Sequence, residues 1–496
     1  MLLALYTCFL LVLGALGVHA GVLGRVARRA KAPMRPAPLP EDALPAVTVQ
    51  LPLYNEVHVA GRLLDAVAAL DYPRDRLDVQ VLDDSDDDTT ALVAERVARL
   101  RGQGLRIAHV RRDTREGFKA GALAEGLRLA EGEIIAIFDA DFVPRPDVLR
   151  RLVLPFANPS IGCVQARWGH LNAAYSPVTQ AQAFGLDLHF AVEHRARVAL
   201  GGFFNFNGTA GLWRRACIED AGGWSARTLA EDLDLSLRAQ LRGWRFTYDA
   251  ETVVPAELPA EIAAWRTQQA RWARGGIGTA RLLLGPLWRS HVALRTKLLT
   301  TVHLLSPLAH PATLGLALLH APVTLDAPIP ALPALVGALG FAGYALAAVV
   351  TRRGAGARGL WPGPLFLAGM VGLSPGLAAA TVAGALGRPA PFARTAKFDA
   401  AGTDPGAAAR SRYRTRRPGV AGWAEVLLAL YALGGLAALL RAERWDALPF
   451  QGLVVAGTLL VAVTGLTQRH AWGSFRRRTL SVPRIRRPAW NASKMP

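Results

Sequence analysis

Long apolar segments stand at both ends of this sequence, and a polar stretch separates them. The first, MLLALYTCFLLVLGALGVHAGVLG, covers residues 1–24, and a helix needs about 20 apolar residues to cross a bilayer. Similar segments recur between residues 296 and 470, and Arg-rich segments flank them, as is typical of cytoplasmic loops. The sequence therefore predicts several membrane-spanning helices and one polar domain between them.

The formal net charge of +19 has two explanations. Basic proteins can bind the phosphates of nucleic acid, but here the Arg clusters adjoin apolar runs, as in GRVARRAKAPMR and RRRTLSVPRIRRP. We therefore expect membrane lipids, and no nucleic acid, as partners. The first apolar segment lacks basic residues before it, so we interpret it as a retained anchor rather than a cleaved signal peptide. Three cysteines without CxxC spacing predict neither a disulfide framework nor a zinc site.

These observations predict the organisation of the chain. The apolar segment at 360–386 is ambiguous, because Arg-rich loops on both its sides require an even number of crossings. It contains Pro375, and we interpret it as a short hairpin or a span plus an interfacial helix. The predicted parts are a transmembrane anchor at 1–24, a Pro/Arg-rich linker at 25–46, a cytoplasmic α/β domain at 47–295, membrane helices at 296–470 with a cytoplasmic loop near 388–421, and a basic tail at 471–496.

Strand and helix patterns alternate in the first part of the polar domain. The strand patterns are VTVQLPLYNE, LDVQVLDDS, LRIAHVRR and EIIAIFDAD, and amphipathic segments separate them. This alternation predicts a parallel, doubly wound sheet, in which ligands bind at the carboxyl ends of the strands. Acidic residues follow the strands at these ends, and they are Glu56, Asp83, Asp84, Asp139 and Asp141.

Two short segments near these strand ends suggest a phosphate ligand. In FDADFVP, Asp139 and Asp141 are one residue apart, and two carboxylates can hold Mg²⁺ or Mn²⁺ together with substrate phosphates. The alternative is a pair of solvated turn acids. In REGFKAGAL, two glycines open a helix start to phosphate and Lys119 adds positive charge, which is a weak signal by itself. VLDDSDDDTT is otherwise a solvated acidic loop.

A family resemblance emerges from the order of the motifs. QLPLYNE, VLDDS, REGFKAGAL, FDAD, FNGTAGLWRR, TLAEDLDLSLRAQLRGW and QQARW follow one another along the chain. This series resembles the membrane-embedded family 2 glycosyltransferases, which include cellulose synthases and cellulose-synthase-like β-mannan and glucan synthases. The resemblance covers roughly residues 45–290 and the apolar segments after them. It implies a GT-A (Rossmann-like) α/β domain and a multi-span α-helical membrane region.

The resemblance also implies roles for individual residues. Asp84, with Asp83 and Glu56 close by, would contact the base and ribose of a nucleotide. Asp232 would be the general base, positioned by Glu231, although acids in the first turn of a helix are the alternative explanation. The remaining implied contacts are Lys119 with the nucleotide, Asp139 and Asp141 with the metal, Gln268 and Arg271 with the diphosphate, Trp272 with the acceptor sugar, and Asn207, Gly208 and Thr209 at the acceptor-side wall.

Two further segments are open to more than one interpretation. QARWGHLN predicts a buried strand, from which Arg167 or Trp168 would reach donor or acceptor. PFARTAKF, residues 391–398, resembles the gating loop of cellulose synthases, a Phe-x-Val-Thr-x-Lys pattern, except that Arg394 replaces the valine. A basic cytoplasmic loop without a gating role is the alternative.

The expected activity is that of an inverting β-glycosyltransferase. It would transfer a hexose from UDP-glucose or GDP-mannose to a growing polysaccharide and couple the transfer to membrane passage. The alternative acceptor is a membrane lipid. A transporter with a nucleotide-binding domain would need intramembrane charges, which the apolar segments almost lack; a basic scaffold would not need the acids named above. We expect a multi-pass protein of a cell inner membrane, and the sequence leaves open any export or periplasmic partner subunit.

Overall fold

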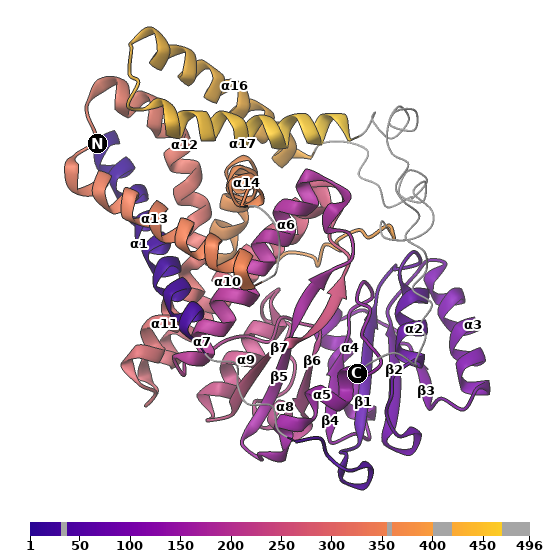
Figure 1. Ribbon diagram of the computed structural model, residues 1–496. Helices are drawn as coiled ribbons and strands as arrows, with labels where there is room; N and C mark the ends of the chain where they lie inside the picture. Colours follow the sequence, from indigo (N-terminus) through magenta and orange to yellow (C-terminus); the bar gives the residue numbers. More distant parts are fainter. Residues whose placement is uncertain (31–36, 355–359, 400–418, 469–496) are drawn as a thin grey trace.

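An α/β domain and a bundle of long helices make up the computed structural model, which describes residues 1–30, 37–354, 360–399 and 419–468. The domain and the bundle meet along α10 (Ile262–Arg289), as Figure 1 shows. The strands are β1 (Val47–Leu53), β2 (Leu77–Asp83), β3 (Ile107–Val110), β4 (Ile134–Ile137), β5 (Ile161–His170), β6 (Gly211–Arg214) and β7 (Arg245–Ala256).

The strands form one sheet in the order β3-β2-β1-β4-β6-β5-β7. The four strands predicted from the sequence are parallel to one another. β6, however, runs antiparallel to both of its neighbours, so the prediction of a wholly parallel sheet is wrong at this strand. The physical reason is the connection, because the chain between β5 and β6 stays at the carboxyl edge of the sheet instead of crossing back.

Helices cover both faces of the sheet, and each face has its own apolar core. The sequence of β4 is apolar throughout because both faces of this strand are covered: Ile134 and Ala136 lie in one core, and Ile135 and Ile137 lie in the other. The helices of this domain are α2 (Ala60–Ala68), α3 (Thr89–Gly102), α4 (Phe118–Leu129), α5 (Val148–Leu152), α6 (Pro177–Leu188), α7 (Arg195–Ala199), α8 (Arg215–Asp220) and α9 (Glu231–Leu241).

The helix bundle contains the apolar segments. Among the described residues, six helical stretches are long and apolar enough to cross a membrane by length and composition, with the stretch Leu294–Asp326 counted as one. The helices are α1 (Leu2–Arg29), α11 (Leu294–Leu305), α12 (Ala309–Asp326), α13 (Ala331–Gly354), α14 (Pro362–Ala385), α16 (Val420–Arg441) and α17 (Leu448–Thr467). α1 continues past the predicted end at residue 24 because the basic residues that follow stay helical as far as Arg29. Just after the helix, Arg195 donates a hydrogen bond to the carbonyl of Ala30 at 2.7 Å.

The ambiguous segment is one continuous helix, α14, so the hairpin prediction is wrong. Pro375 lies inside this helix without ending it. α14 packs lengthwise on α10, since Gly369 faces Trp265 and Gly384 faces Arg274. Its start also lies at the α/β domain, where the indole N–H of Trp361, just before the helix, donates to Gln180 at 3.2 Å. Both ends of α14 therefore lie beside that domain, and an even number of crossings stays a prediction.

α1 and α13 approach each other closely along a stripe of small residues, the packing that membrane helices commonly use. A Cβ on Gly17 would lie 2.2 Å from the carbonyl oxygen of Gly340, which no real side chain can do. The two backbones therefore touch at this point. α1 and α13 pack against each other here although more than three hundred residues separate them in the sequence.

We expect Gly17→Leu to separate α1 from α13 and to lower the stability of the protein by about 1–3 kcal/mol, as overpacking does. Thermal unfolding in detergent checks this. Gly434→Leu is the matched control, since a Cβ at Gly434 meets nothing within 4 Å. Equal melting temperatures for the two variants would contradict the close contact.

Candidate active site

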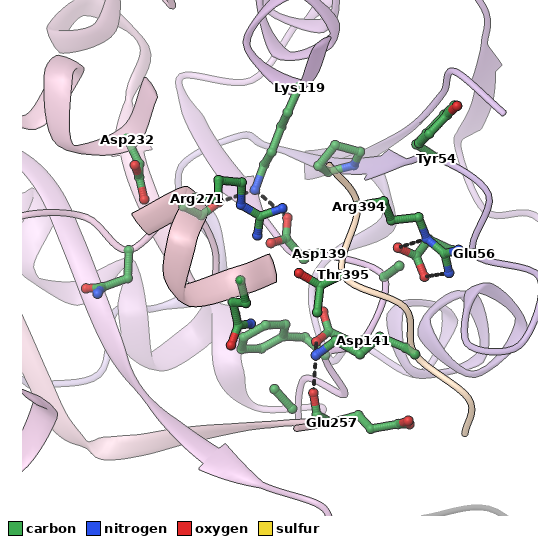
Figure 2. A pocket seen from close by; sticks show the side chains of 18 of the residues that line it. Tyr54, Glu56, Lys119, Asp139, Asp141, Asp232, Glu257, Arg271, Arg394 and Thr395 are labelled. Carbon is green, nitrogen blue, oxygen red and sulfur yellow. Dashed lines mark hydrogen bonds and ion pairs between the residues drawn. The ribbon is translucent and has the colours of Figure 1, made fainter. Parts of the chain in front are cut away.

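A cavity of about 180 Å³ opens at the carboxyl ends of β1 and β4, where the acids were predicted to gather. Figure 2 shows several of its lining side chains, which come from segments far apart in the sequence. The predicted site residues that line it are Glu56, Asp84, Lys119, Asp139, Asp141, Asn207, Gly208, Glu231, Asp232, Gln268, Arg271 and Trp272, and Trp168 joins them.

The loops after β1 and β2 are fastened to each other at the mouth of this cavity. Asn55, at a φ of 56° that few non-glycine residues adopt, donates from its backbone N–H to Ser85 at 2.8 Å. Its side-chain amide donates to Asp86 at 2.7 Å. These bonds hold Glu56 and Asp84 on the same side of the sheet. Asp84 in turn accepts two hydrogen bonds from Arg112, at 3.0 and 2.5 Å.

Three predicted residues do not line the cavity. Asp83 is the last residue of β2 and its side chain is fully buried, where it accepts from the Ser85 backbone and pairs with His109 at 2.9 Å. Thr209 accepts the backbone N–H of Asp139 at 2.8 Å. Arg167 donates to the carbonyl of Ala250. These three side chains do not line the cavity, and their ligand contacts stay predictions. Asp83 faces away from the cavity because adjacent strand residues face opposite ways, so that Asp84 lines it instead.

The paired acids of FDAD carry lysine partners. Lys119 lies 2.5 Å from Asp139 and also donates to the carbonyl of Gly208 at 3.0 Å. Lys397, from the distant segment 391–398, lies 2.5 Å from Asp141. Burial and the negative charge of Asp141 raise the pKa of Asp139 in spite of Lys119. Two neighbouring carboxylates repel each other unless positive charge lies beside them, and Lys119 and Lys397 supply that charge here.

The same two carboxylates fit a divalent cation in their chemistry. Both offer only hard oxygen ligands, which Mg²⁺ and Mn²⁺ prefer. Within the described residues, no group of three or more His, Cys, Asp or Glu side chains is placed to hold a metal ion. A cation at Asp139 and Asp141 would therefore take further ligands from water or from substrate, as Mg²⁺ does with phosphates.

Asp232 stands in the first turn of α9, opposite the FNGTAG loop. Gly208 of that loop has a φ of 81°, and a Cβ there would lie 3.1 Å from an Asp232 carboxylate oxygen, so the loop backbone needs glycine at this point. Burial and the negative charge of Glu231 raise the pKa of Asp232 to about 7. This carboxyl group can therefore accept a proton near neutral pH.

α10 brings the QxxRW side chains to the other wall. Arg271 extends toward Asp139 and Lys119 in Figure 2, and it donates to the carbonyl of Ala393 at 3.1 Å. Burial lowers the pKa of Arg271, and the surrounding acids oppose that shift. Trp272 is 37% exposed and lines both this cavity and a second one of about 380 Å³, which continues toward α11 and α14.

Segment 391–398 lies across the cavity. Arg394 forms a bidentate ion pair with Glu56, at 3.1 and 2.9 Å, as the dashed lines in Figure 2 show. Burial raises the pKa of Glu56 to about 7 although Arg394 lowers it. The ring of Phe392 lies 6.0 Å from Phe118 and under the Arg271 guanidinium. The segment is thus part of the cavity wall, and the arginine that departs from the family pattern pairs with an acid in the loop after β1.

Sequence reasoning missed three residues at the cavity. The Arg115 guanidinium stacks on the Tyr54 ring at 3.3 Å, and both residues lie inside motifs whose other members were noticed. Glu257 directly follows β7 and lies within 3.1 Å of Arg62. It has the same signal as the other acids, a carboxylate at a strand end, but β7 was not recognised as a strand.

Comparison with known proteins shows which family and which relatives the α/β domain is similar to. The family described as "Glycosyltransferase like family 2" matches residues 45–275. Glucomannan 4-beta-mannosyltransferase 1 of Oryza sativa subsp. japonica is 43% identical over 266 residues, which cover 51% of each chain. Glucomannan 4-beta-mannosyltransferase 2 of Arabidopsis thaliana is 44% identical over 252 residues, 50% of this chain and 47% of that one. The match thus covers about half the length of each of these relatives.

A solved structure supports the fold. The mannosyltransferase PcManGT of Pyrobaculum calidifontis, in complex with GDP-Man and Mn²⁺, aligns with a TM-score of 0.56. The alignment covers 78% of this chain and all of that chain, at 23% sequence identity. The predicted resemblance and the GT-A fold class are therefore confirmed.

We expect Lys397→Ala to strengthen the binding of Mn²⁺ alone to the full-length protein by about tenfold, because a buried ammonium competes with the cation for Asp141. Titration followed by the Mn²⁺ electron-spin resonance signal measures this. Lys297→Ala is the control, since Lys297 contacts only the carbonyl of Trp288, away from the cavity. Asp139→Asn should weaken binding, and an unchanged affinity in Lys397→Ala would contradict the competition.

Proposed function

We propose that this chain, whose residues 45–275 belong to the family described as glycosyltransferase like family 2, transfers mannose from GDP-mannose to a hydroxyl of a growing β-glycan. One observation carries the proposal: a carboxylate whose pKa is near 7, an acidic pair suited to a cation, and a half-buried arginine line the same cavity. The similar chains, named glucomannan 4-beta-mannosyltransferases, favour mannose and a polysaccharide product.

The chemistry follows from the charges on the two walls. Asp232 takes the proton of the acceptor hydroxyl while its oxygen attacks the anomeric carbon and the bond to the diphosphate breaks. A single displacement of this kind inverts the configuration and gives a β-linkage. Arg271, with Gln268 beside it, binds the departing diphosphate through its guanidinium fork. A divalent cation held by Asp139 and Asp141 would neutralise charge on that diphosphate.

Segment 391–398 must move away from the cavity before the donor can enter. Its lysine and arginine now meet the acids that a cation and a nucleotide would need. Asp141 would hold a cation in place of Lys397 when the donor is bound, and the ammonium of Lys397 would then be free to pair with phosphate. The loop then closes over the donor instead of over an empty cavity, which matches the gating pattern that its sequence resembles.

The second cavity supplies a path for the acceptor. It starts at Asp232 and Trp272 and is lined by three tryptophan rings, those of Trp168, Trp265 and Trp272. Aromatic rings with polar neighbours suit a sugar chain, which presents both C–H faces and hydroxyl groups. The cavity continues along the bundle of apolar helices, so we place the reaction at the cytoplasmic face of an inner membrane and couple it to passage of the product.

The pKa of Asp232 sets the pH dependence. A base whose pKa is raised to about 7 is protonated, and inactive, below that pH, and it is ionised above it. We therefore expect kcat/KM, which reports the free enzyme, to fall about tenfold per pH unit below 7 and to level off above it. A profile that is flat between pH 5 and pH 8 would contradict this assignment.

The function is tested with the full chain in nanodiscs, given Mn²⁺ and radiolabelled GDP-mannose or UDP-glucose. We expect label from GDP-mannose in an ethanol-insoluble β-mannan. Asp232→Asn should lower transfer by about 10²- to 10⁴-fold, the usual contribution of a general base. Asp65→Asn is the control, because Asp65 is exposed and pairs only with Arg96 and Arg99. Label in the organic phase would show that the acceptor is a lipid. Labelled polymer from UDP-glucose would show that the donor is UDP-glucose and not GDP-mannose.

A further inference from the structure

A row of polar side chains, most of them half-buried, forms one wall of the second cavity, and the proposed mechanism leaves it without a role. His189 and Glu193 belong to the π-helix His189–His194 between α6 and α7, and Asn205 and Asn207 lie in the loop between α7 and β6. π-Helical turns inside α-helices are uncommon and occur often at functional sites. The cavity-lining members are His189, Glu193, Asn205 and Asn207, and His303 of α11 faces them.

The side chains are connected in sequence. Arg197, whose side chain is 3% exposed, lies 3.4 Å from a carboxylate oxygen of Glu193. The same oxygen lies 3.0 Å from Nδ1 of His189. Nε2 of His189 lies 2.8 Å from the side-chain nitrogen of Asn207. Arg197, Glu193, His189 and Asn207, in this order, are called the His189 relay below.

The contacts of the His189 relay determine where its protons lie. Burial acts to raise the pKa of Glu193, but the hydrogen bond from His189 and the charge of Arg197 outweigh it and lower that pKa. Glu193 is therefore an ionised carboxylate that only accepts, so Nδ1 of His189 carries a proton. Nε2 of His189 then accepts from the Asn207 amide nitrogen, which turns the other end of that amide, Oδ1, away from the histidine.

Oδ1 of Asn207 is left without a hydrogen-bond partner among the described residues, although it is buried. An unpaired buried carbonyl oxygen is destabilising, and a hydrogen-bond donor from a ligand would remove that penalty. Asn207 lines both cavities and precedes Gly208, whose backbone faces Asp232. The backbone N–H of Asn207 is held by Gln165 at 2.9 Å, so only the orientation of its amide group remains to be set.

We propose that the His189 relay fixes the amide of Asn207 so that its Oδ1 accepts a hydrogen bond from a hydroxyl of the acceptor sugar, next to the hydroxyl that Asp232 deprotonates. This inference rests on the proposed glycosyl transfer. Asn207 is the residue that contacts the acceptor. His189, Glu193 and Arg197 are positioning residues, which act through Asn207 and touch neither the donor nor the reacting atoms.

The relay predicts a specific kinetic defect. His189→Phe keeps a ring of similar size but cannot accept from Asn207, and Glu193→Gln removes the charge that fixes the histidine proton. Each change should raise KM for a soluble mannotetraose acceptor by about tenfold, the effect of one misplaced hydrogen bond. Hydrolysis of GDP-mannose by water and the Kd for GDP should stay within about twofold of the unchanged protein, because the donor side is untouched.

Two controls separate positioning from folding. Glu219→Gln makes the same substitution in an exposed Arg–Glu pair of the same spacing, Arg215 with Glu219, on the surface helix α8, and should change nothing. His189→Gln can still donate to Glu193 and accept from Asn207, so it should retain most of the acceptor affinity that His189→Phe loses. Loss of donor hydrolysis or GDP binding in His189→Phe would mean that the relay is structural.

A double-mutant cycle gives the decisive result. If His189 acts through Asn207, His189→Phe should weaken acceptor use about tenfold in the natural chain but less than about twofold in an Asn207→Ala background. Additive effects would show that His189 acts independently, and would overturn the inference. The proposed function fails by a different outcome, the absence of transfer from GDP-mannose by the unaltered protein.

Discussion

Half-buried carboxylates gathered at one sheet edge are the constraint on which the rest of this structure depends. Parallel strands end at the same edge, and four acids from three strand ends, Glu56, Asp84, Asp139 and Asp141, enter one cavity there. Unpaired buried charges are strongly destabilising. The chain therefore brings a cation to each: Arg112 from the loop after β3, Lys119 from α4, and Arg394 and Lys397 from a segment beyond α14.

This need for positive charge ties the α/β domain to the helix bundle. The segment that carries Arg394 and Lys397 stands between α14 and α16, so its place over the cavity depends on both helices. A second link lies at α10, where Arg266 forms a bidentate ion pair with Glu425 of α16, at 2.6 and 2.5 Å. Glu425 is 1% exposed, and an acid so placed on an apolar helix needs this partner. The helix that bears Arg271 and Trp272 is thereby fixed against the bundle.

A second polar region lies on the side of Asp232 where we propose that the acceptor binds. The cavity there combines aromatic rings with a row of hydrogen-bonded side chains, and these side chains leave one oxygen atom, Oδ1 of Asn207, unpaired. The proposed donor and acceptor sides are therefore stabilised by different kinds of interaction. Charge compensation dominates around Asp139 and Asp141, whereas directed hydrogen bonds dominate around His189, and Asp232 lies where the two regions meet.

The sequence by itself determined five of the seven strands and most of the site. Alternating strands and helices and acids at strand ends are local signals, and the order of the motifs, through the family resemblance, supplied the rest of the twelve predicted residues that line the cavity. Only the tertiary structure decided the rest. Asp83 and Asp84 are adjacent and face opposite ways because strand side chains alternate, but only the tertiary structure decided that Asp84 is the one that faces the cavity. β6 is antiparallel because of where its connection lies, and the hydropathy of α14 does not reveal that it packs along α10. The pairings Lys397–Asp141 and His189–Asn207 join residues that no periodicity relates, so they exist only once the chain has folded.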